Sequence, residues 1–255
     1  MLGFKDLRQT IGTASLNTLY SRGILSTIHH AAAGRGKLDT VNGMHGFYPD
    51  WNENSVDFRF FSDTVFLFTE NDSITSFINL IRSANSLLAA SLSGFKCPFR
   101  GAITKGDLIN NPNGILIGKA IEEAYLAEQS QAWAGVMLTD ECEKFIESKN
   151  YLSAYSQAFL YVAENESDPY KKARAKNFSA FIKRYPTPIQ KRDNSGNKSY
   201  STKESYVLDW TLLTTASADS AFQDKSDSHV STLRDNTIAF EKWAISLRTS
   251  GTLGI

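Results

Sequence analysis

The sequence contains little cysteine, no excess charge of either sign and no long hydrophobic run. Its two cysteines, Cys97 and Cys142, are too few and too far apart for a disulfide framework or a zinc knuckle, which favours a reduced, cytoplasmic compartment. The 27 basic and 27 acidic residues give a formal net charge of zero, so bulk electrostatics predicts neither a nucleic-acid nor an anionic-membrane partner. No apolar run approaches the roughly 20 residues needed to cross a bilayer, and the N-terminus lacks the pattern of a signal peptide.

Three segments have the pattern of helices. Asn71-Asp72-Ser73 supplies an N-cap for an apolar face that ends at Gly94, which predicts a helix between them. Further helices are predicted over residues 119–131 and 228–247. Short apolar runs between the helices are typical of strands, and residues 34–54, rich in Gly, Asn and Asp, are predicted to form a loop. This order predicts an α+β or α/β sandwich with helices on one face of a mixed sheet.

The C-terminal part has a less regular pattern. A helix is predicted over residues 169–184, and Tyr185-Pro186-Thr187-Pro188 is expected to break it. Residues 193–203 are predicted to form a polar loop that separates two strand-like pieces, one near Ile189 and one at residues 206–210. The loops and short elements predicted here leave the role of this part of the chain open.

Residues 58–68 form one of the most apolar windows in the chain, with a single carboxylate, Asp63, in the middle. Two aromatic and β-branched runs flank Ser62-Asp63-Thr64 and predict two strands joined by a tight turn. Taken alone, Asp63 is typical of a turn residue, because aspartate tolerates the turn backbone and caps it locally. A functional role for this carboxylate therefore depends on the rest of the chain.

Four pieces of the sequence occur together in a characteristic order: Gly3-Phe4, Phe60-Phe61-Ser62-Asp63-Thr64, Phe99-Arg100-Gly101-Ala102-Ile103-Thr104-Lys105-Gly106, and Ile117-Gly118-Lys119-Ala120-Ile121-Glu122-Glu123-Ala124. In this order and spacing, roughly residues 1–140 resemble the catalytic domain of the class III nucleotide cyclases, the adenylate/guanylate cyclase superfamily. The chain looks most like the bacterial pyrimidine cyclases of Pycsar antiphage defence. Tyr-Pro-x-Pro at residues 185–188 and Val207-Leu208-Asp209-Trp210 are similar to the C-terminal extension of those proteins.

The resemblance implies an α+β fold of the ferredoxin-like class III cyclase type, with helices packed on a mixed or antiparallel sheet. It implies a cyclase catalytic domain over residues 1–145 and a mostly helical C-terminal extension over residues 146–255, packed on the first domain. Class III sites form between two subunits, so the resemblance also implies a homodimer.

The cyclisation reaction sends a ribose 3′-oxygen onto the α-phosphorus of the same nucleotide and expels diphosphate. Two divalent ions, Mn²⁺ or Mg²⁺, suit this reaction, and hard cations of this kind take oxygen ligands. In the family, two aspartates on neighbouring strands hold the metals, and Asp63 matches the second of them. The first precedes the Gly-Phe pair by three residues and would fall immediately before Met1, so we expect an upstream reading frame to encode a strand that ends in aspartate.

Other positions depart from the purine cyclases of the family. Arg59 stands where they read the base with a lysine, and its planar fork suits a carbonyl-bearing base edge, although a surface charge on an edge strand explains it equally well. Ile115 replaces the second base-reading residue. Glu122 and Leu126 replace the transition-state asparagine and arginine. Arg100 is a candidate for the phosphates, and a pairing with a neighbouring carboxylate is an equally good account.

Three hypotheses follow from the sequence. The first is a pyrimidine nucleotide cyclase with UTP as the preferred substrate and CTP second, whose catalytic residues include Asp63 and Arg100 and whose nucleotide-binding residues include Arg59 and Glu122. Its cyclic product would act on a downstream effector as an antiphage signal, with no nucleic-acid or membrane partner. The second is a non-catalytic nucleotide-binding or dimerisation module derived from the same fold. The third is an unrelated α+β domain in which Asp63 is only a turn residue.

Overall fold

A computed structural model describes residues 24, 27, 36–41, 44–49, 56–61, 64–94, 96–111, 115–193, 195–222 and 228–250; in the strands over residues 36–49 and at residues 228–229 it describes the backbone alone. The region of the predicted Gly-Phe match, residues 1–23, lies outside the described residues. Asp63 also lies outside them.

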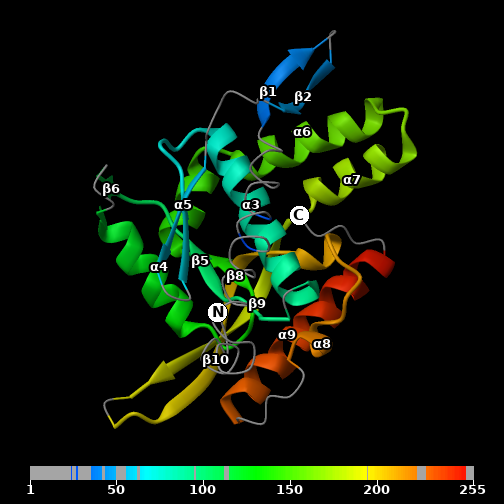
Figure 1. The fold of residues 1–255 in the computed structure, drawn as a ribbon. Coiled ribbons are helices and arrows are strands. Elements are labelled where there is room, and N and C mark those ends of the chain that lie inside the picture. The colour runs from blue at the N-terminus through cyan, green and yellow to red at the C-terminus, as the bar shows by residue number, and fades with distance from the viewer. Residues whose placement is uncertain are drawn as a thin grey trace, which may run out of the picture.

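The largest sheet has four strands in the order β5 (Gly101–Ile103), β8 (Val136–Leu138), β10 (Lys198–Leu208) and β9 (Ile182–Arg192) (Figure 1). β5 and β8 run parallel, with helix α4 (Lys119–Ser130) between them in the chain, and the other neighbours are antiparallel. A mixed sheet covered by helices places the chain in the α+β class, as predicted. β9 and β10 follow residue 146, so both predicted parts of the chain contribute to this sheet. The division after residue 145 stays a prediction.

Three short hairpins accompany the sheet. They are β1 (Gly36–Val41) with β2 (Met44–Pro49), β3 (Asp57–Phe61) with β4 (Thr64–Phe68), and β6 (Ile109–Asn110) with β7 (Leu116–Ile117). The β3–β4 hairpin confirms the strand pair predicted over residues 58–68. The predicted loop over residues 34–54 is wrong, because β1 and β2 occupy much of it. Asn42-Gly43 between two six-residue runs is a strong hairpin signal that outweighs the polar composition of the segment.

The helices predicted from capping signals are confirmed. α3 (Ile74–Ser93) begins after Ser73, whose side chain accepts a hydrogen bond from the backbone N–H of Ser76, and ends at Gly94. The helices predicted over residues 119–131 and 228–247 correspond to α4 and to α9 (Ser228–Thr249). The other helical elements among the described residues are α5 (Asp140–Ser148), α6 (Tyr151–Asn165), α7 (Pro169–Ser179), η2 (Trp210–Leu212) and α8 (Ala218–Ala221).

Two predictions for the C-terminal part are wrong. The helix predicted over residues 169–184 ends at Ser179, and β9 runs straight through Pro186 and Pro188. Proline is tolerated here because β9 is the edge strand of the sheet, where an outward-facing N–H forms no ladder bond. The predicted loop over residues 193–203 is likewise shorter than expected, because β10 begins at Lys198.

The core centres on Trp133, whose side chain is fully buried between the sheet and α9. Its ring centroid lies 4.8 Å from that of Phe240 in α9 and 5.7 Å from that of Tyr185 in β9. Tyr185 and Phe240 also contact each other edge-on, with centroids 5.0 Å apart. Aromatic packing of this kind adds to the burial of large apolar surfaces and joins the C-terminal helix to the sheet.

Gly135 lies against the indole of Trp133, and this contact gives a test of the core. A Cβ added at Gly135 would overlap the indole ring, whereas a Cβ at Gly101 would meet Val136 at an ordinary 3.5 Å. We expect Gly135→Ala to lower the free energy of unfolding by about 2–3 kcal/mol, since overpacking forces the ring or the strand to shift. Gly101→Ala, the control, should change it by less than about 1 kcal/mol. Equal effects of the two substitutions in chemical denaturation would contradict this packing.

Candidate functional site

The β3–β4 hairpin positions the predicted metal ligand. The ladder closes at the pair Phe61–Thr64, and the two residues that connect them, Ser62 and Asp63, lie outside the described residues. Four side chains of the hairpin pack partly buried against the core: Phe58, Phe60, Val65 and Leu67. Phe61 is 77% exposed, and Thr64 is also exposed. The hairpin is therefore anchored along its length, while its last pair lies at the solvent-accessible surface.

Arg59 links the β3–β4 hairpin to the β6–β7 hairpin. Its Nη2 donates to Oδ1 of Asn110 at 3.2 Å, and its Nη1 donates to the carbonyl of Phe58 at 2.9 Å. The guanidinium also lies over the ring of Phe68, 5.5 Å from the centroid. These contacts hold Arg59 at the surface between the two hairpins. Among the described residues, no carboxylate pairs with its guanidinium. A role in base recognition stays a prediction.

Glu122 lies exposed in the first turn of α4, where a negative charge is favoured by the helix dipole. The preceding Gly118 is required by a close approach, because a Cβ there would overlap the backbone of Asp107. The next residue, Glu123, forms a different network: it pairs with Lys119 at 3.1 Å and accepts from Thr104 at 3.2 Å. The hydrogen bond that Lys119 donates to the Glu123 carboxylate raises the pKa of Lys119. The structure therefore places Glu122 beside this network and open to solvent.

Arg100 is buried in an ion pair with Glu128. Its Nε donates to Oε1 of Glu128 at 2.5 Å, and its Nη1 donates to the carbonyl of Gln131 at 3.1 Å. Only 9% of the Arg100 side chain is exposed. The pair joins the residue before β5 to the last turn of α4. The sequence allowed two roles for Arg100. The structure shows the pairing with a carboxylate, and phosphate binding stays a prediction.

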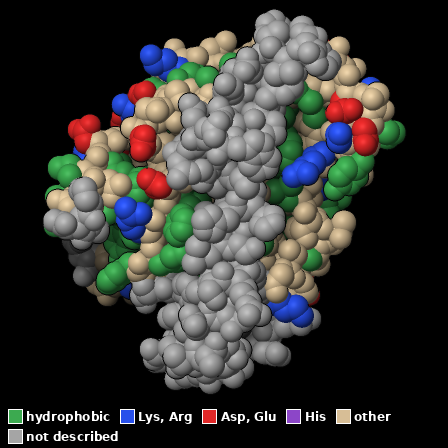
Figure 2. Space-filling model, turned by 45° about the horizontal axis from the view of Figure 1, so that its top comes forward, with side chains coloured by type: hydrophobic (Ala, Val, Ile, Leu, Met, Phe, Trp, Pro, Cys, Tyr) green, Lys and Arg blue, Asp and Glu red, His purple; other side chains and the backbone are tan. Residues whose placement is uncertain are grey.

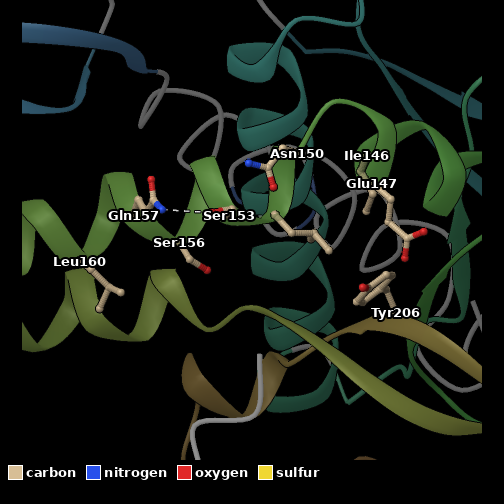
Figure 3. A pocket seen from close by; sticks show the side chains of 9 residues that line it. Ile146, Glu147, Asn150, Ser153, Ser156, Gln157, Leu160 and Tyr206 are labelled. Carbon is tan, nitrogen blue, oxygen red and sulfur yellow. Dashed lines mark hydrogen bonds between the residues drawn. The ribbon is translucent and has the colours of Figure 1, made fainter.

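A groove of about 390 Å³ opens between α5, α6 and β10 (Figure 3). Glu147 and Tyr206 lie together near one end of it, and Leu160 lies at the other. Burial, opposed by the nearby Arg184 and assisted by Glu147 and Glu143, raises the pKa of Tyr206. None of the predicted site residues lines this groove. Sequence reasoning missed α6, although Tyr155, Phe159 and Ala163, which it buries, recur every four residues and could have predicted a helix here.

A buried carboxylate, Asp209, lies where β10 ends. Its Oδ1 accepts from the backbone N–H and the hydroxyl of Thr211, at 3.1 and 2.5 Å, and its Oδ2 lies 3.4 Å from Nη1 of Arg248 in α9. Burial raises the pKa of Asp209, although Thr211, Arg248 and Lys183 oppose this shift. Perturbed carboxyls occur both at functional sites and in structural ion clusters. Asp209 caps η2 through Thr211 and binds the end of α9 through Arg248, so its role is structural.

The described residues, which do not include Asp63, contain no group of three or more His, Cys, Asp or Glu side chains arranged to hold a metal. Within the same part of the chain, no helix has the length and hydrophobicity needed to span a bilayer. Acidic and basic side chains are interspersed on the face shown in Figure 2. Comparison of the sequence and fold with protein families, curated proteins and solved structures found no match.

The burial of the Arg100–Glu128 pair predicts a large effect of its removal. Arg100→Met leaves the Glu128 carboxylate without its partner, so we expect the free energy of unfolding to fall by about 3 kcal/mol. The control is Lys144→Met, because Lys144 forms a 3.3 Å pair with Glu141 in which the two side chains are 72% and 55% exposed. Such exposed pairs contribute at most about 1 kcal/mol. If denaturant titration shows Arg100→Met to be as stable as the unaltered chain, Arg100 is not held in this pair.

Proposed function

We propose that the chain is a pyrimidine nucleotide cyclase that converts UTP, and less readily CTP, to the 3′,5′-cyclic mononucleotide and diphosphate. The observation that carries the proposal is the β3–β4 hairpin, whose register leaves Ser62-Asp63 as its connection. This is the position at which the resemblance puts a metal-binding aspartate. The order that follows, α3, β5, α4 and β8, is also the order that the four matched pieces imply.

The hairpin suits a hard cation and a triphosphate because its end is open to solvent, as the exposure of Phe61 and Thr64 indicates. Asp63 would supply carboxylate oxygens to one or both of two divalent ions, Mn²⁺ or Mg²⁺. When bound, such ions lower the pKa of the 3′-hydroxyl and neutralise the triphosphate. In the reaction, the bond between the 3′-oxygen and the α-phosphorus forms, the bond from that phosphorus to diphosphate breaks, and the hydroxyl proton passes to solvent.

Arg59 and Glu122 are proposed to contact the nucleotide. The fork of Arg59 can donate two hydrogen bonds to a base carbonyl, and its present acceptor, Asn110, is a surface side chain that substrate can displace. Glu122 is exposed and accepts hydrogen bonds, so it suits an N–H or ribose hydroxyl rather than a phosphate. Arg100 is bound to Glu128, so its contribution to the phosphates is the least supported part of the proposal.

The proposal also includes a strand that carries a second aspartate and lies beside β5. Among the described residues, β5 pairs with a strand on one side only, and the β3–β4 hairpin forms a separate sheet. A strand between β5 and the hairpin would join the two sheets and bring its last residues near the hairpin connection.

A homodimer is part of the proposal. Large apolar side chains on α4 and on the β6–β7 hairpin are at least 50% exposed: Ile109, Ile115, Ile117, Tyr125 and Leu126. α4 buries none of its residues, so its outer surface is available to a second copy. A contact across α4 would bring Glu122 of each copy to the interface.

The second candidate is a nucleotide-binding module without catalysis. It is favoured by Glu122 and Leu126, which replace the transition-state residues of the family, and by the engagement of Arg100 with Glu128. The two candidates differ in turnover and not in binding.

Purified protein incubated with each of four labelled nucleoside triphosphates and Mn²⁺ provides the test. We expect a cyclic product from UTP, a smaller amount from CTP and none from ATP or GTP, measured by chromatography against standards. Asp63→Ala should reduce the product at least about a thousandfold, because a metal ligand is lost.

Asp72→Ala is the matched control, since Asp72 is an exposed aspartate at the start of α3. It should retain activity. Binding of UTP without product would favour the second candidate, and turnover by Asp63→Ala would end the metal assignment.

A further inference from the structure

β9 and β10 extend beyond the helices as a two-stranded arm (Figure 1). Near the end of the arm, Oδ1 of Asp193 accepts hydrogen bonds from the backbone N–H groups of Ser195 and Asn197, at 2.9 and 2.8 Å. The hydrogen bonds with Asn197 and Ser195 also lower the pKa of Asp193. Four residues of β10 in this arm are exposed in succession, at positions 199–202.

The outer edge of β10 in the arm faces no described strand. β8 pairs with β10 only at Val207, whereas β9 pairs with it along residues 198–208. The backbone N–H of Tyr206 donates to Oε1 of Glu143 in α5, so it points away from β9. In an antiparallel ladder, alternate residues point their N–H and C=O groups to the same edge. The backbone groups of residues 204, 202, 200 and 198 therefore also point outward.

The prolines of β9 agree with this orientation. Pro186 pairs with Glu204 and Pro188 pairs with Thr202, so at these positions β9 donates no bond to β10. The carbonyl of Pro188 instead accepts from the N–H of Ala132 on the far side of β9. Pro186 and Pro188 thus occupy outward-facing positions of β9, and residues 202 and 204 direct their own N–H groups to the open edge of β10.

An antiparallel copy of the same strand matches this edge. If two copies of β10 pair about a two-fold axis at Ser201, residue 198 faces 204 and residue 200 faces 202. All four of these residues have outward backbone groups, so the register makes eight hydrogen bonds. It also places Lys198 opposite Glu204 of the second copy, on the same face as Arg192, the ladder partner of Lys198. Opposite charges facing each other stabilise a strand pair, and like charges would oppose it.

We propose that the arms of two copies of this chain pair through β10, centred on Ser201, to form a continuous four-stranded intermolecular sheet. The occupant of the edge is a second copy because the register is self-complementary in both hydrogen bonds and charge. The basic tip, with Lys191 and Arg192, then approaches the acidic first turn of α5 of the other copy. This contact is independent of the proposed cyclase activity.

Disulfide trapping tests the register. Ser201 pairs with itself at the axis, in a non-hydrogen-bonded position with about 4.5 Å between Cα atoms, which suits a disulfide. We expect Ser201→Cys to form a covalent dimer under mild oxidation, seen on a non-reducing gel. Ser199→Cys is the control: it is exposed and on the same face, but its copies would lie about 13 Å apart. Cys97 and Cys142 are buried, so they contribute little background.

Two changes in the Ser201→Cys background test the cause of pairing. Thr202→Pro removes an outward N–H and no bond to β9, so it should slow cross-linking while leaving the hairpin folded. Lys198→Glu should slow cross-linking about tenfold, and adding Glu204→Lys should restore it. Equal cross-linking of Ser201→Cys and Ser199→Cys, or none at Ser201→Cys, would overturn the proposal. Either result leaves the nucleotide assay unaffected.

Discussion

The packing of Trp133 against Tyr185 and Phe240 is the interaction on which the rest of the structure depends. Trp133 lies between α4 and β8, Tyr185 lies in β9, and Phe240 lies in α9, so three distant parts of the chain meet in one buried cluster. The same cluster fixes the start of β8 and hence the position of its parallel neighbour β5. β9 and β10 supply two of the four strands of that sheet, so the C-terminal part of the chain contributes to it.

Helix α4 and the β3–β4 hairpin, which carry the proposed site, are attached to the edges of this core. α4 is held by the Arg100–Glu128 pair at its last turn and by the close approach of Gly118 to Asp107 at its start. Its outer surface stays exposed, with Tyr125 facing solvent. The β3–β4 hairpin is attached by apolar side chains while its end is open. The α4 surface and the hairpin end are thus attached to the core and also exposed. A site shared between two copies of the chain needs both properties.

Much of the fold could be predicted where the signals are local. Ser73 and Gly94 mark the ends of α3 because caps act within one turn of their own residue. Long-range pairing could not be predicted in the same way: β9 contains Pro186 and Pro188, and only its place at the edge of the sheet makes them acceptable. The partner of Arg100 was also out of reach, because Glu128 becomes its neighbour only once α4 packs beside β5.

The central claim is that the hairpin connection at Asp63 holds a divalent metal. Paramagnetic broadening by Mn²⁺ in the amide spectrum of the full-length protein tests it without reference to turnover. The account predicts that Mn²⁺ broadens the signals of Phe60, Phe61 and Thr64 first, and that Asp63→Ala abolishes this effect while the rest of the spectrum is unchanged. Broadening that persists in Asp63→Ala, or that starts elsewhere in the chain, would contradict it.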